Sequence, residues 1–271
     1  MNAPDKIFLP DVQAFADNRA LAIDRVGIRR LRFPIQVARA GQPALSTVAE
    51  FDLYVGLEAS VKGTHMSRFV EVLHTHGADY SPAGMRVLAR QILERLEAPT
   101  AYIKARFPYF VAKRAPVSGV ESLMDYEVEF TVEAHSATDI DVSVKVVVPV
   151  TSLCPCSKKI SEYGAHNQRS HITIDASVGE DAPALEDLIA IAEAEASCEI
   201  WGLLKRPDEK YVTERAYDNP KFVEDLVRDV ALALESDDRV LSYTVESENF
   251  ESIHNHSAYA LIRSDKKARR A

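Results

Sequence analysis

The feature that most constrains the fold is an order of strand-like and helix-like segments that occurs twice along the 271 residues. Alternating or β-branched patterns predict strands in both halves, at 25–38, 47–59, 100–117, 121–136, 139–152, 166–179, 239–252 and 253–266. Apolar residues at helical spacing predict helices between the strand pairs, at 65–76, 82–98, 184–197 and 219–236. Each half therefore reads as two strands, two helices and two strands.

Short turns between successive strands predict antiparallel pairing, with the helices packed on one face of the sheet. We predict an α+β protein of two tandem modules, at 25–137 and 138–266, with an N-terminal arm at 1–24 and a basic tail at 267–271. The two halves share little letter-by-letter identity, so the repeat is one of architecture. A single α+β domain whose order happens to repeat is the alternative.

Charge and hydropathy limit which kinds of molecule the protein can bind and where in the cell it can lie. The formal net charge of −9 argues against nucleic acid or an anionic membrane surface, although a pocket can still be locally basic. No apolar run approaches the roughly 20 residues that span a bilayer, and the N-terminus has acidic residues and prolines where a secretory signal would be cationic and then apolar. We predict a cytoplasmic protein, in which three cysteines are not a disulfide framework.

The most informative segment is 149–174, PVTSLCPCSKKISEYGAHNQRSHITI, a polar loop that follows a strand of valines. Cys154 and Cys156 have a spacing that fits neither a closed four-ligand zinc site nor a thioredoxin motif. A thiolate and an imidazole are good donors for a borderline divalent metal, so His166 could return across the loop to an ion held by Cys154. Inert thiols in a structural turn, or a Cys–His nucleophile for acyl transfer, are the alternatives.

A second group of candidates lies near the C-terminus, in SENFESIHNHSAYA (247–260). Glu251, His254 and His256 are close in sequence, and the two histidines would share one face of a strand. Histidine is the natural proton carrier near neutral pH, which favours a role in proton transfer. Two histidines on a solvated strand face are the alternative.

Glu224 lies at the edge of the apolar stripe of the helix predicted at 219–236. It is either a partly exposed glutamate or a carboxylate that accepts hydrogen bonds from the N–H donors of a guanine edge. A predicted loop between the second pair of helices carries further polar residues within reach of the segment 149–174, namely Arg206, Asp208 and Glu209.

Basic side chains at the start of a helix favour phosphate binding, because unpaired backbone N–H groups and the helix dipole add to their charge. A helix entrance with solvated charges is the alternative. The candidates are Lys62, His65, Ser67 and Arg68, together with Arg169 and His171.

Four segments together closely resemble the type IB GTP cyclohydrolases: PVTSLCPCSKKISEYGAHNQRSH, KGTHMSRF, NPKFVEDLVRD and ENFESIHNHSAYA. The resemblance spans residues from about 20 to 265. It implies the tunnelling fold in a bimodular form, whose subunits join sheets edge to edge into barrels, here a homotetramer with active sites between subunits. It also implies a hydrolase that acts on the C–N bonds of a cyclic amidine, in the first step of folate biosynthesis. GTP and water give formate and 7,8-dihydroneopterin triphosphate, after a metal-activated water attacks C8 of guanine.

The resemblance also assigns roles to individual residues. It implies that Cys154 is the key metal-binding or catalytic thiol, with His166 and Glu209 as further ligands or close neighbours of a divalent ion such as zinc, manganese or iron. It implies that Glu224 anchors the purine and that Glu251, His254 and His256 deliver protons. The implied triphosphate contacts are Lys62, His65, Arg68, Arg169 and His171. Cys156 and the arm receive no role.

Two rival functions remain open from the residues alone. One is a tunnelling-fold nitrile reductase that acts on a deazaguanine with a cysteine nucleophile and a nicotinamide cofactor. The other is a purine-binding or scaffold protein without catalysis. Incubation with GTP separates these alternatives, because only a cyclohydrolase releases formate and a pterin.

Overall fold

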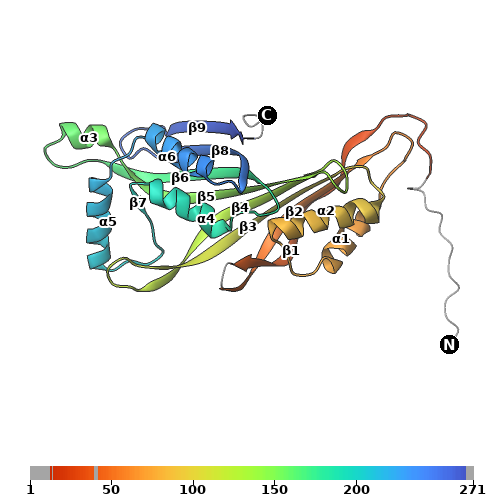
Figure 1. Cartoon of the computed structure of the whole chain (residues 1–271), viewed down its shortest axis with the longest axis horizontal. Helices are drawn as coiled ribbons and strands as arrows, with labels where there is room; N and C mark the ends of the chain where they lie inside the picture. The colour runs from red at the N-terminus through yellow and green to blue at the C-terminus, as the bar shows by residue number, and fades with distance from the viewer. Residues whose placement is uncertain (1–12, 14, 40–41, 267–271) are drawn as a thin grey trace.

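The computed structural model describes residues 13, 15–39 and 42–266. Within them, a single antiparallel sheet runs in the order β1-β2-β3-β4-β5-β6-β8-β9, and the short strand β7 pairs with β5 (Figure 1). The strands are β1 (Ile23–Arg39), β2 (Gln42–Leu57), β3 (Ala101–Arg114), β4 (Glu121–Ala134), β5 (Ile140–Leu153), β6 (Asn167–Val178), β7 (Cys198–Glu199), β8 (Val240–Asn249) and β9 (Ala258–Asp265).

Long helices cover one face of this sheet (Figure 1). The helices are α1 (Met66–Thr75), α2 (Pro82–Leu96), α3 (Pro155–Ile160), α4 (Leu185–Glu195), α5 (Arg206–Asp218) and α6 (Val223–Ser236). Helix α2 packs on the strands from β2 to β5, α4 on β5 and β6, and α6 on β8 and β9. No helix in the described part of the chain is long and apolar enough to cross a membrane.

The core lies between the helices and the apolar face of the sheet. Alternate valines of β5, such as Val144, Val146 and Val148, are fully buried there, as the period of two in a half-covered strand requires. The other face carries charges that pair from strand to strand with alternating sign. This row runs through Arg32, Glu50, Arg106, Glu129, Lys145 and Asp175.

The predicted fold class is confirmed: the chain is α+β, with an antiparallel sheet and helices on one face. Two strands, two helices and two strands follow one another twice, and α3, β7 and α5 are added in the second half. The predicted break near residue 137 lies between β4 and β5, which pair with each other from Ala134↔Ile140 to Glu127↔Val147. Because the sheet continues through this point, the division into two modules stays a prediction.

Three local predictions are wrong. The segment 206–218 is the helix α5 rather than a loop, because an acidic first turn and a proline near its start stabilise a helix that has no apolar stripe. The helix predicted at 184–197 ends at Glu195, and the short strand β7 begins at Cys198 soon after it. The last strand begins at Ala258, and 250–257 is a loop that connects β8 to β9. The predicted tail at 267–271 lies outside the described residues.

Candidate active site

The structure brings Cys154 and His166 together at one end of the strand pair β5–β6. Leu153 ends β5 opposite Asn167, which begins β6. One step further along, the Cys154 N–H donates to the His166 carbonyl at 3.1 Å. The loop between the two strands therefore returns as predicted and places the thiol and the imidazole on adjacent backbone positions.

Ser157 links these two residues, and the sequence analysis did not identify it. Its hydroxyl donates to the Cys154 carbonyl at 3.1 Å and accepts from the His166 N–H at 3.2 Å. The Ser157 N–H in turn donates to the Cys154 Sγ at 3.5 Å. A serine three residues after a helix-starting position commonly bonds to nearby backbone, which is the only signal of this role in the sequence.

The ring of His166 is oriented by Gln168, a second residue that the sequence analysis missed. Its Nδ1 lies 3.0 Å from Gln168 Oε1 and 3.9 Å from Glu251 Oε2. An amide oxygen can only accept, so Nδ1 carries the hydrogen in this bond and a neutral ring keeps its lone pair on Nε2. A side chain that bonds to one ring nitrogen of a histidine in this way fixes its tautomer and direction.

The loop 250–257 attaches to the same end of the sheet. The Phe250 N–H donates to the Arg169 carbonyl at 3.0 Å, and the Phe250 ring meets the His171 ring edge-on at 4.9 Å. His254 and His256 are exposed in this loop, with their rings stacked at 5.2 Å. Although they are not on a strand as predicted, the two rings still lie side by side.

Arg169 and His171 line a cavity of about 270 Å³ on the face away from the helices. A second cavity of about 520 Å³ shares lining residues with it on the same face. The residues common to both are Asp125, Glu127 and Val147. Two of the predicted phosphate contacts therefore adjoin the Cys154 end of the sheet, in a hollow that also carries carboxylates.

Within one chain, Glu209 lies away from Cys154 and His166. It is exposed in the first turn of α5, whereas α3 meets the far end of α5, where the Lys158 ammonium donates to the Tyr217 carbonyl. About 12 Å of helix separates Glu209 from Tyr217. No group of three or more His, Cys, Asp or Glu that could hold a metal occurs among the described residues, so the predicted set of three ligands stays a prediction.

Asp208, beside Glu209, is buried, and its carboxylate is hydrogen-bonded to a distant turn of the chain. It accepts from the N–H groups of Val117 and Ser118 and from the Ser118 hydroxyl at 2.6 to 2.9 Å. Burial opposes ionisation, but these hydrogen bonds and one from the Lys205 N–H outweigh it and lower the pKa of Asp208 below its ordinary value. The carboxylate therefore fixes the start of α5 to the turn between β3 and β4.

Glu224 is exposed in the first turn of α6, so its carboxylate is accessible to a ligand. Nothing else in the described residues tests its predicted contact with a guanine.

The remaining phosphate candidates lie at the opposite end of the sheet. His65 and Arg68 line a cavity of about 360 Å³ that Val55 and Gly56 also line. The exposed Lys62 lies just before His65, in the same loop. The sheet register joins Val55 to Ala101, Ala134 and Ile140, where β5 begins. Strand β5 is 14 residues long, which is about 45 Å at 3.3 Å per residue. One chain therefore holds this group and Cys154 too far apart for a single triphosphate.

A long antiparallel sheet with helices on one face is the architecture of the tunnelling fold. The structure of urate oxidase from Bacillus sp. TB-90 has this fold and superposes with a TM-score of 0.51, covering 90% of this chain and 100% of that chain at 10% identity. A hyperthermostable mutant of that enzyme gives a TM-score of 0.51 over 90% of this chain and 99% of its own. At such low identity these likenesses show the fold alone.

The chain belongs to the type I GTP cyclohydrolase FolE2 family, whose model matches residues 9–260. It is 57% identical to the GTP cyclohydrolase FolE2 of Azoarcus sp. (strain BH72) over 98% of this chain and 99% of the relative. It is 60% identical to the FolE2 of Ralstonia nicotianae over 96% of each chain. The predicted family and enzyme class are confirmed: the protein is a GTP cyclohydrolase of folate biosynthesis.

Proposed function

We propose that the protein converts GTP and water into formate and 7,8-dihydroneopterin triphosphate, with Cys154 and His166 at the reacting end of the substrate. This proposal depends above all on the pairing of the Cys154 and His166 backbones at the end of β5 and β6. Ser157 and Gln168 hold the two residues in one arrangement before substrate arrives. Such preorganisation is what a site for difficult C–N bond cleavage requires.

The donors at this end fit a divalent metal ion such as zinc, manganese or iron. The Cys154 thiolate and the His166 Nε2 would hold it, because Gln168 occupies Nδ1 and both donor types suit borderline divalent ions. When bound, such an ion supplies Lewis-acid activation of the water that attacks guanine C8. Glu209 is the proposed third ligand, and it would have to come from another copy of the chain, since α5 keeps it away from its own Cys154.

Protons are the second requirement of the reaction, because two C–N bonds break and a new ring closes. Glu251 lies against the His166 ring, and both side chains are shielded from solvent, at 13% and 14% exposed. The stacked His254 and His256 lie further out on the same loop. We assign the proton transfers to this group, since carboxylates and imidazoles near neutral pH both accept and release protons. Glu224 is the proposed acceptor for the guanine N–H donors.

We further propose a homotetramer in which two copies complete each site. The support is the separation of Lys62, His65 and Arg68 from Cys154 along the length of β5, together with the two edge strands β1 and β9 that end the sheet. Unpaired edges are a liability unless another chain covers them. Edge-to-edge assembly would protect them and bring the basic group of one copy to the Cys154 end of the next. A cytoplasmic location would keep Cys154 reduced.

Product analysis tests the function directly. The purified protein is treated with a chelator, and zinc, manganese or iron is added back before incubation with GTP. We expect formate and, after oxidation, a fluorescent pterin in equal amounts, both dependent on added metal. Bound GTP with no release of formate in any metal-loaded sample would contradict the proposal.

A further inference from the structure

Strand β5 continues past its neighbour β4, and this creates a local problem in the sheet. Pairing between β4 and β5 stops at Glu127↔Val147, whereas β5 runs on to Leu153. Figure 1 shows β3 and β4 bending away from β5 toward the end that carries α3. The last residues of β5 would therefore have unpaired backbone groups along one edge, which is costly in a buried position.

The segment 196–221 closes that edge up to the residue before Cys154. Strand β7 pairs Cys198 and Glu199 with Thr151 and Val150. The Leu153 N–H donates to the Ser197 hydroxyl at 3.1 Å. These contacts leave β5 with a bonding partner on each side as it enters the site loop.

The carbonyl of Leu153 is held from the same segment. The Lys221 N–H donates to it at 3.1 Å, so both backbone groups of Leu153 are bonded outside the β5–β6 ladder. Cys154 follows directly, and its own N–H is bonded to His166. The direction in which the Cys154 side chain leaves the backbone therefore depends on Ser197 and Lys221.

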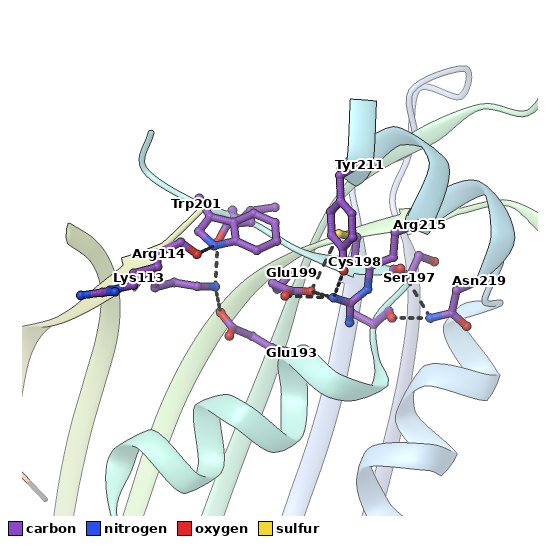
Figure 2. Close-up of polar contacts among 12 residues, drawn as sticks. Lys113, Arg114, Glu193, Ser197, Cys198, Glu199, Trp201, Tyr211, Arg215 and Asn219 are labelled. Carbon is purple, nitrogen blue, oxygen red and sulfur yellow. Dashed lines mark hydrogen bonds and ion pairs between the residues drawn. The ribbon is translucent and has the colours of Figure 1, made fainter. Parts of the chain in front are cut away.

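Ser197 is itself held by Asn219, the residue that follows α5, as Figure 2 shows. The Asn219 amide donates to the Ala196 carbonyl at 2.8 Å and to the Ser197 carbonyl at 3.4 Å. Arg215 on α5 pairs with Glu199 at 2.9 Å. Ser197 is fully buried, so its hydroxyl has no solvent to replace Leu153 as a partner.

Helix α5 also connects this region to the first half of the chain. Asp208 at its start bonds to the turn at Val117 and Ser118, and Tyr217 near its end accepts from Lys158 of α3. The Lys158 ammonium lies 4.3 Å from the Tyr217 ring centroid as well. The helix thus spans the space between the diverging β3–β4 hairpin and α3 (Figure 1).

We propose that residues 196–221 form a clamp that holds Cys154 in its metal-binding direction, with Ser197 as the positioning residue. The part of this inference that concerns metal rests on the proposed function. Mutation of a residue that orients a metal ligand typically lowers metal affinity by about 10- to 100-fold. A clamp that acts through one hydrogen bond belongs at the lower end of that range.

The test compares Ser197→Ala with a matched control, Ser152→Ala. Ser152 is equally buried and closer to Cys154 in sequence, but its hydroxyl bonds to Ser170 at 2.8 Å and not to the Leu153 backbone. Each variant loses one buried hydroxyl and one hydrogen bond. Two measurements are made on the full-length protein: hydrogen exchange of the peptide 153–160 without metal, and titration with Co²⁺ followed by the thiolate-to-cobalt absorption band.

We expect Ser197→Ala to speed exchange in 153–160 and to weaken Co²⁺ binding about tenfold, while Ser152→Ala stays close to wild type in both. Equal behaviour of the two variants would overturn the clamp, as would wild-type exchange in Ser197→Ala. If the wild-type protein shows no thiolate–cobalt band, the proposed metal role of Cys154 fails. The exchange comparison without metal still decides whether the clamp exists.

Discussion

The two halves of the chain use the same scaffold but join their long helices differently. In the first half a short connection at 76–81 links α1 to α2, whereas in the second half the segment 196–222 links α4 to α6 and contains β7 and α5. The first connection turns the chain and buries Tyr80 in the core against Phe51. The second closes an open strand edge and reaches both the site loop and the opposite hairpin. The added segment of the second half therefore contributes buried residues and, unlike the first connection, also bonds to the strand that leads into the site loop.

The halves are also bonded to each other through the second pair of helices. Glu193 of α4 accepts from the Tyr126 hydroxyl at 2.7 Å and from the Lys113 ammonium at 2.6 Å. Burial and the neighbouring Glu193 carboxylate raise the pKa of Tyr126 above its ordinary value, so this hydroxyl stays a donor. Glu186, two turns earlier, accepts from Tyr109. The first half thus supplies strands that the second half's helix needs as partners.

The largest expected effect is a difference in kcat between variants of the two thiols in the site loop, Cys154 and Cys156. Cys154→Ala should lower kcat by roughly 10³-fold or more, since it removes the thiol on which the proposed chemistry depends. Cys156→Ala, two residues away and exposed, is the matched control and should stay within about twofold. Formate release gives the rates, and circular dichroism shows that both variants fold. Comparable rates for the two variants would remove Cys154 from the mechanism.

Mixing experiments test whether each site combines the second half of one copy with the first half of another copy. A Cys154→Ala chain and an Arg68→Ala chain should each be nearly inactive alone. Co-assembly after dissociation should restore about one quarter of wild-type activity, because a site built from two random copies is intact in that share of cases. Two copies of the same variant, treated identically, provide the control. Mixtures no more active than their components would show that the two groups do not share a site.

A smaller effect is expected at Glu224, the proposed purine anchor in the second half. Glu224→Gln should raise KM for GTP about tenfold, since charge-assisted hydrogen bonds contribute about 1.5–3 kcal/mol. Glu214→Gln serves as a control, because that carboxylate is exposed and paired with Lys210 on the outside of α5. Steady-state kinetics measure both. An unchanged KM in Glu224→Gln would contradict the assignment.

The smallest expected effect concerns the contact between α5 and the first half. Asp208→Asn should cost about 1–3 kcal/mol of unfolding free energy, because a buried acceptor is lost. The pKa of Asp208 is lowered on folding, so its stabilisation is fully present above the unfolded value of about 3.9. It is lost as the pH falls toward the folded value. Urea unfolding between neutral pH and about pH 3 should therefore show a weaker acid dependence in Asp208→Asn than in the exposed control Asp218→Asn.

Much of the fold was predictable because period and turn signals are local. The strand segments and four long helices follow directly from alternation and apolar spacing. Helix α5 was not predictable because RPDEKYVTERAYD has no apolar stripe. Its stability comes from Asp208 and from packing that only the tertiary structure supplies. The strand predicted from residue 253 failed because the histidine alternation there reflects a loop with stacked rings.

The candidate site was predictable where it depends on chain continuity. Cys154 and His166 meet because a loop joins two paired strands. Gln168, Ser157 and Ser197 were not predictable in the same way, since each acts on a group whose position depends on the fold. Ser197 lies 44 residues from Leu153, whose N–H donates a hydrogen bond to the Ser197 hydroxyl. The sequence alone could not show that Glu209 and Cys154 lie apart in one chain, because that depends on the direction of α5.

The row of alternating charges has a consequence for how the strands find their alignment. A shift of β5 by two residues against β6 would still place apolar residues opposite Val144, Val146 and Val148, namely Val178, Ala176 and Ile174. The same shift would move Lys145 from Asp175 to the uncharged Ser177. Oppositely charged cross-strand pairs contribute roughly 0.2–1 kcal/mol each. The polar face can therefore select one alignment from a set that the buried face cannot distinguish.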